Sequence, residues 1–143
     1  MARLDYEAMI KEHYRQYSRP RQFLVKSRTL PNFYDHNSYN STHNYEGYNR
    51  MREAWKAGFP DHHVTCERIM TSRTSTVAIL TFTGTHTGPF MGIPATGRPI
   101  SIGAIDVIRY HRGKPVEHWG EMDLLGLLQQ LGVMTVPGEH AIL

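Results

Sequence analysis

Two aspartates occupy positions in which a carboxylate could transfer protons. Asp106 interrupts the apolar stretch Ile102–Ile108, and Asp123 directly precedes the apolar run Leu124–Leu131. A carboxylate serves as a general base near neutral pH when burial raises its pKa. Such a base can remove a proton from a carbon flanked by carbonyl groups, if a donor stabilises the oxyanion that develops. Both aspartates are therefore candidate catalytic residues.

Each aspartate also has a purely structural interpretation. Asp123 stands where a helix N-cap is expected, and aspartate is a preferred capping residue. Asp106 would be a buried carboxylate satisfied by Trp119 or by a backbone amide, because an unpaired buried charge is costly. If both open into one cavity, their pKa values would separate, giving one acid and one base.

The neighbours of Asp106 depend on the register of a hairpin. Arg112-Gly113 is expected to form a two-residue loop between two strands. In that register Asp106 lies opposite Trp119 and shares its covered face with Glu117, because alternate residues point to the same side. His118 then points to the other face, towards a dimer contact, although a single β-bulge would turn it inward.

The helices and strands that must position these residues can be predicted from the spacing of apolar residues, which changes midway along the chain. The first half has apolar residues at helical spacing, and the second half is rich in Val, Ile, Thr and Phe at strand spacing. Helices followed by antiparallel strands predict an α+β fold, with helices packed on a curved sheet whose open mouth forms a pocket. The predicted helices are 4–18, 21–29, 45–58 and 123–131, and the predicted strands are 63–70, 76–86, 99–111 and 114–121.

Composition favours one ordinary globular domain over residues 1–143. Apolar residues make up 40% and charged residues 20% of the chain. No stretch approaches the roughly 20 apolar residues that cross a membrane, and the N-terminus lacks the apolar core of a signal peptide. A single cysteine agrees with a soluble, cytoplasmic protein. The net charge is +3, but the basic residues are scattered, which argues against nucleic-acid binding.

The nine histidines do not form a recognisable metal motif. His62 and His63 are adjacent, so on a strand they would point to opposite faces. No pair of histidines has helical ligand spacing beside a carboxylate. We therefore expect no metal.

Residues 84–132 carry a long ordered pattern that runs from GTHTGPFMGIP through VEHWGEMD to LLQQLG. This pattern resembles the SnoaL-like polyketide cyclase family of the nuclear-transport-factor-2-like superfamily, and PNFYDH and AWKAGFPD continue it upstream. The resemblance implies a cone-shaped α+β barrel that forms a homodimer and needs no cofactor. It also implies a small apolar or aromatic carbonyl substrate, cyclised by an intramolecular aldol reaction.

The resemblance assigns roles to individual residues. Aligning QQLG at 129–132 places the catalytic carboxylate of the family at Asp123. The aldol cyclases have a histidine where this chain has Asp106, so the chain departs from their pattern at this position. The catalytic candidates are Asp123, Asp106 and His118. The candidates for substrate binding are His36, Trp119, Tyr17 and Met51.

The sequence thus predicts a cofactor-independent cyclase or isomerase that uses a buried aspartate as general acid and base. Because the superfamily supports many activities on one scaffold, two alternatives remain. One is a non-catalytic small-molecule-binding protein, and the other is a dehydratase or hydrolase.

Overall fold

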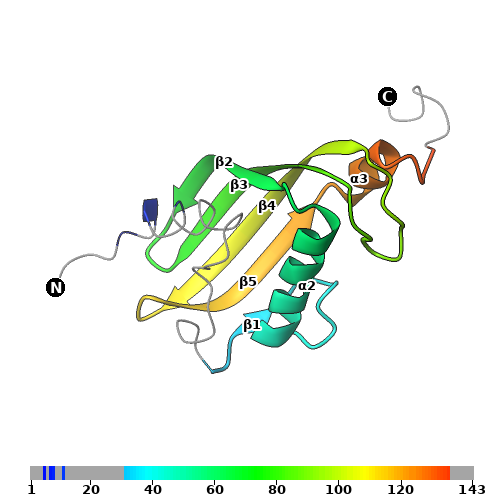
Figure 1. Cartoon of the computed structure of the whole chain (residues 1–143). Coiled ribbons are helices and arrows are strands. Elements are labelled where there is room, and N and C mark those ends of the chain that lie inside the picture. Colours follow the sequence, from blue (N-terminus) through cyan, green and yellow to red (C-terminus); the bar gives the residue numbers. More distant parts are fainter. Residues whose placement is uncertain (1–4, 6, 9–10, 12–30, 136–143) are drawn as a thin grey trace.

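The computed structural model describes residues 5, 7–8, 11 and 31–135. The elements in this part of the chain lie close to their predicted positions, except for the short strand at Tyr34–Asp35, which was not predicted (Figure 1). In chain order they are β1 (Tyr34–Asp35), α2 (Tyr45–Gly58), β2 (His63–Thr71), β3 (Ser75–Thr85), β4 (Pro99–His111), β5 (Lys114–Met122) and α3 (Leu124–Gln130). The predicted helices at 4–18 and 21–29 lie almost wholly outside the described residues. No described helix is long and apolar enough to cross a membrane.

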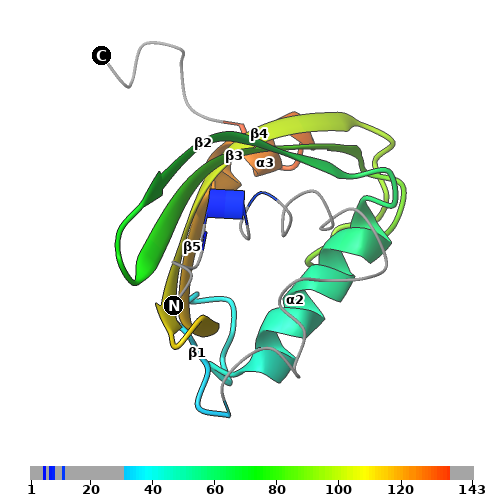
Figure 2. The same cartoon turned by 90° about the vertical axis from the view of Figure 1, so that its left-hand side faces the viewer.

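The strands form one five-stranded sheet in the order β1-β5-β4-β3-β2. Strands β2 to β5 are antiparallel neighbours, whereas the short β1 pairs in parallel with the edge of β5. Figure 2 shows the sheet bent into an open arch, with α2 across from its concave side. The predicted α+β class, with a helix packed on a curved sheet, is confirmed.

The core fills the space between α2 and the concave face of the sheet. Alternate residues of β3 are buried, including Ala78, Leu80 and Phe82, as expected for a strand covered on one side. Trp55 of α2 is 1% exposed and packs against Phe82 with the ring centroids 5.6 Å apart. This aromatic contact holds the middle of α2 over the sheet.

Both ends of α2 are fixed by local contacts. The Asn44 side chain caps its start by accepting a hydrogen bond from the Gly47 N–H at 3.0 Å. At the other end, the Gly88 N–H donates to the Gly58 carbonyl. A Cβ atom at Gly88 would lie 1.9 Å from the carbonyl oxygen of Ala57, so the loop approaches the helix this closely only with glycine. The cap thus fixes where the helix begins, and the loop after β3 holds its C-terminal end.

The β4–β5 hairpin has the predicted two-residue loop but a different register. Arg112 and Gly113 both have positive φ, and His111 pairs with Lys114. Tyr110 then pairs with Pro115 while Arg109 pairs with Glu117, so Val116 is an extra residue in β5. The prediction that Asp106 faces Trp119 is therefore wrong, because this β-bulge shifts the register by one and places Gly120 opposite Asp106.

The bulge decides which side chains of β5 face the core. His118 is buried, whereas Trp119 is 36% exposed on the other face. The predicted orientations of Glu117, His118 and Trp119 are thus reversed beyond the bulge, since a one-residue shift turns every later side chain to the opposite face.

We predict that inserting one alanine between Glu117 and His118 destabilises the protein by about 3 kcal/mol or more. Because the bulge at Val116 already sets the register before this point, the insertion would place Trp119 opposite Asp106, turn it inward and remove His118 from its buried carboxylate partners. Thermal or urea unfolding would measure the loss. Inserting one alanine after Arg73 in the exposed β2–β3 turn is the control, and we expect it to be tolerated. Equal stability of the two variants would contradict this account of the bulge.

Candidate active site

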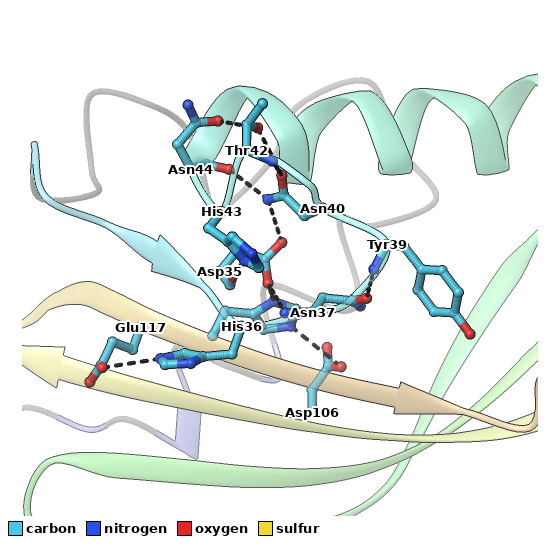
Figure 3. Close-up of polar contacts among 11 residues, drawn as sticks. Asp35, His36, Asn37, Tyr39, Asn40, Thr42, His43, Asn44, Asp106 and Glu117 are labelled. Atoms are coloured by element: carbon cyan, nitrogen blue, oxygen red, sulfur yellow. Dashed lines mark hydrogen bonds and ion pairs between the residues drawn. The ribbon is translucent and has the colours of Figure 1, made fainter.

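Asp35 is a buried carboxylate fixed on the edge strand β1. It is 2% exposed, and β1 places it directly beside His118 of β5. Its Oδ2 accepts a hydrogen bond from Asn40 Nδ2 at 2.8 Å, and its Oδ1 accepts one from the Asn37 N–H at 3.2 Å (Figure 3). The turn that follows β1 therefore holds this carboxylate in one orientation.

His118 connects Asp35 to Asp106. Its Nδ1 lies 2.8 Å from Asp35 Oδ1, a good hydrogen-bond distance. Its Nε2 lies 3.5 Å from Asp106 Oδ1, which is an ion-pair contact longer than an ordinary hydrogen bond. The imidazole is thus held between two carboxylates, with Asp35 as the tighter partner.

This environment keeps His118 protonated. Burial by itself lowers the pKa of His118, but the negative charges of Asp106 and Asp35 outweigh it and raise the pKa to about 10. At neutral pH the group is therefore an imidazolium whose charge is shared between a fixed carboxylate and a more accessible one. The Asp106 side chain is 19% exposed, against 3% for that of Asp35.

Because Gly120 has no side chain, Asp106 and His118 have room to approach each other. It lies opposite Asp106 in the β4–β5 pairing. A Cβ atom at this position would lie 2.9 Å from Asp106 Oδ1 and 3.2 Å from His118 Cε1. A larger residue would push the two side chains apart, so glycine at this position is part of the site.

Asp35, His118 and Asp106 line one cavity between α2 and the sheet. The cavity has a volume of about 40 Å³ and opens to solvent. Its described polar lining includes Asp35, Asn37, Asn40, Arg52, Asp106 and His118. Its apolar lining includes Tyr48, Met51, Trp55, Phe82, Ala104 and Met122. A cluster of ionisable groups thus faces a largely aromatic and aliphatic chamber.

The sequence pattern that defines the SnoaL-like polyketide cyclase family matches residues 10–131. The chain belongs to the SnoaL-like polyketide cyclase family. A search among curated protein sequences found no match. The family membership agrees with the cavity-bearing α+β fold.

Solved structures resemble this SnoaL-like chain over nearly its whole length. TsrD from Streptomyces laurentii is 32% identical, with a TM-score of 0.78, covering 92% of this chain and 99% of its own. IdmH from Streptomyces antibioticus, a proposed polyketide cyclase, is 26% identical with a TM-score of 0.78, covering 91% and 100%. AclR from Streptomyces galilaeus, a proposed hydroxylase, is 23% identical with a TM-score of 0.83, covering 96% and 91%, which shows a shared fold.

Asp123 does not occupy the buried position that its predicted role requires. It is exposed and caps α3, accepting a hydrogen bond from the Gly126 N–H at 2.8 Å. It is absent from the described lining of the cavity that holds Asp106 and His118. Asp123 thus has the capping role that the sequence offered as its structural interpretation, because β5 has already ended when the chain reaches this residue. Its catalytic role stays a prediction.

Of the predicted substrate-binding residues that the structure describes, only Met51 lies at the cavity. Met51 lines the cavity, whereas Tyr17 lies outside the described residues. His36 and Trp119 stack on each other with ring centroids 4.2 Å apart, on the face of the sheet opposite the cavity. His36 also pairs with Glu117 at 3.2 Å. The structure thus places His36 and Trp119 away from the chamber.

Sequence reasoning missed Asp35 and Arg52. Asp35 belongs to PNFYDH, the segment from which His36 was selected, and the asparagines at 37 and 40 that now hold it were a usable signal. Arg52 lies among apolar residues on the buried face of α2, which the helical spacing of Tyr48 and Trp55 could have indicated. Among the described residues, no three His, Cys, Asp or Glu side chains are grouped as a metal site would require.

We predict that His118 makes the protein less stable as the pH rises from about 6.5 to about 10. In the folded protein the imidazole keeps its proton up to about pH 10, whereas in the unfolded chain it loses it near the ordinary value of 6.5. Between these values the native state binds the extra proton, so the free energy of unfolding falls as pH increases. Thermal melts across this range at constant ionic strength would measure the slope.

The variant His118→Asn should have lower stability at pH 7 and a shallower slope towards pH 10. The exposed His63→Asn is the matched control and should keep the slope of the unmodified protein. An unchanged slope in the His118 variant would refute the proposed protonation state.

Proposed function

We propose that this chain is a cofactor-independent cyclase or isomerase of a polyketide-like carbonyl compound, in which Asp106 is the general base. One observation supports this most: Asp106 contacts a buried imidazolium fixed by Asp35, at the wall of a chamber with mainly apolar sides. Family membership and the proposed cyclase IdmH support the same general chemistry.

The reaction would begin with proton transfer to Asp106. Its carboxylate would remove a proton from a carbon flanked by carbonyl groups, leaving an enolate in the cavity. The enolate carbon would attack a second carbonyl of the same molecule and form the ring carbon–carbon bond. The alkoxide produced would take the proton back from Asp106, so the reaction needs no co-reactant. In an isomerisation the proton would return to a different atom of the enolate.

His118 and Asp35 would position the base Asp106, and His118 would stabilise the negative charge of the oxyanion. The imidazolium holds Asp106 in place through their 3.5 Å ion pair and places a positive charge beside the forming oxyanion. Asp35 is a positioning residue, since it contacts His118 and not the reacting atoms. Its hydrogen bonds to Asn37 and Asn40 fix the orientation of the Asp35 carboxylate, and thereby that of His118, before substrate binds.

The chamber walls favour a flat, apolar substrate. Trp55 and Phe82 form an aromatic surface next to the charged groups, and Met51 adds a flexible apolar side chain. Such walls exclude water from the reacting centre, which strengthens the interactions of the imidazolium with an enolate. We place Met51 among the residues that contact substrate.

We predict that the protein accelerates hydrogen–deuterium exchange at the acidic CH2 of 2-tetralone, a flat ketone, and that Asp106→Asn lowers this rate by about 100-fold or more. Asparagine has the size of aspartate but cannot accept the proton. Mass spectrometry or proton NMR in D2O would follow the exchange, with thermal melts to confirm folding of each variant.

Asp123→Asn is the matched control for the same assay. Asparagine is also a good helix cap, so this variant should fold and keep its exchange rate within about twofold. Loss of exchange in the Asp123 variant with retention in the Asp106 variant would reverse our assignment. A protein that binds 2-tetralone without accelerating exchange would instead be a binding module.

We also propose that the protein forms a homodimer through the sheet face opposite the cavity. Exposed apolar side chains lie on this face in neighbouring strands, including Ile105, at 49% exposure, and Trp119, at 36%. Val107, which pairs with Trp119 and lies two residues from Ile105, continues the surface. An apolar surface of this kind is typical of an interface between protein chains.

We predict that Ile105→Glu converts the dimer into a monomer, because it places a charge in the middle of the apolar interface. Size-exclusion chromatography with light scattering would give the mass. Met70→Glu is the control, since Met70 is a similarly exposed apolar residue, at 48%, on β2. A dimeric Ile105→Glu variant, or a monomeric unmodified protein, would contradict the proposed interface.

A further inference from the structure

Arg52 is a buried cation in the wall of the cavity. Its side chain is 3% exposed and lines the same chamber as Asp106 and His118. It lies on the buried face of α2 between Tyr48 and Trp55, a position where an apolar residue is expected. A charged side chain at such a position needs partners that replace the lost water.

The partners found for Arg52 satisfy only one of its three nitrogen atoms. Nη2 pairs with Glu53, whose side chain is 54% exposed. Within the part of the chain that the structure describes, the buried Nε and Nη1 atoms have no hydrogen-bond partner. A guanidinium group carries five N–H donors, three of them on these two atoms. Leaving such donors buried and unsatisfied is costly, which indicates a group that is completed by a ligand.

The carboxylates of the cavity do not supply the missing partner. Asp35 and Asp106 both contact His118. Glu121 also lines the cavity, but among the described residues Glu53 is the only carboxylate within ion-pair distance of Arg52. Figure 2 shows α2 across from the concave side of the sheet that carries Asp106 on β4 and His118 on β5. The chamber therefore has a base on its sheet wall and an incompletely paired cation on its helix wall.

We propose that Arg52 binds a carboxylate group of the substrate, so that the protein acts on a carbonyl compound that is an acid and not an ester or amide. The identity of the reaction rests on the proposed function, but the anion site does not. A carboxylate seated on Arg52 would satisfy the unpaired donors and place the apolar body of the molecule against Trp55 and Phe82, directed towards Asp106.

Binding of 2-naphthoate and of its uncharged analogue 2-naphthamide would test the anion site. The two probes have the same flat ring system and differ in charge. We expect the unmodified protein to bind 2-naphthoate more tightly, and Arg52→Gln to weaken that binding by about 30-fold while changing 2-naphthamide binding by less than about threefold. Calorimetry or ligand-induced shifts in melting temperature would report both affinities.

Arg50→Gln is the matched control, because Arg50 lies exposed on the same helix and the substitution removes the same charge. It should leave 2-naphthoate binding unchanged. Equal binding of the two probes by the unmodified protein, or equal effects of the Arg50 and Arg52 substitutions, would overturn the proposal.

Thermal stability separates a binding role from a structural one. Replacing Arg52 by Met keeps the aliphatic stem and removes an incompletely paired buried charge, so the ligand-free variant should melt about 3 °C higher. A purely structural arginine would instead give a lower melting temperature. Loss of stability in Arg52→Met together with unchanged 2-naphthoate affinity in Arg52→Gln would refute the inference.

The Asp106→Asn variant distinguishes failure of this proposal from failure of the proposed function. We expect it to bind 2-naphthoate at least as tightly as the unmodified protein, because it removes a negative charge from the cavity. Retained binding without any catalysed exchange would leave the anion site standing and overturn only the enzymatic assignment. Catalysed exchange without preference for the anion would overturn only the role of Arg52.

Discussion

The ion pair between His118 and Asp35 connects the parts of the molecule that form the cavity. It joins β5 to the short edge strand β1, and the turn after β1 leads through Asn40 to the start of α2. The distant strand β5 is therefore connected to β1 and, through Asn40, to the start of α2. Because a buried charge without its partner is strongly destabilising, this contact constrains the path of the chain around it as well as the chemistry inside it.

The same constraint explains why His118 can act beside Asp106. Two carboxylates near one imidazole would repel each other in an apolar environment, but the positive charge between them stabilises both. Asp35 is immobilised by the backbone N–H of Asn37 and the side chain of Asn40, whereas Asp106 is more open to the cavity. The arrangement thus divides one charge cluster into an anchoring end and an accessible end.

The cavity combines this satisfied cluster with the incompletely satisfied Arg52. Protein interiors rarely contain unpaired hydrogen-bond donors. Arg52, which has such donors, and the paired cluster of Asp106 and His118 lie on facing walls of one chamber. An apolar residue at this position would bury no unsatisfied donor, which supports the proposal that Arg52 serves binding. The apolar residues around both groups strengthen their electrostatic effects by excluding water.

The sequence by itself determined the order and type of the described elements other than β1, the Arg112-Gly113 hairpin loop and the helix cap at Asp123. These features follow from local properties: the period of apolar residues, turn preferences and capping hydrogen bonds. It also marked Asp106 as a carboxylate on a covered strand face. The tertiary structure alone decided that Val116 forms a bulge, that His118 rather than Trp119 faces Asp106, and that Asp35 and Arg52 belong to the site. A single extra residue in one strand leaves no local signature, yet it reverses every later side chain. The position of the bulge depends on the buried contacts that it allows His118 to make, and Asp35, one of the partners in these contacts, is far away in the sequence.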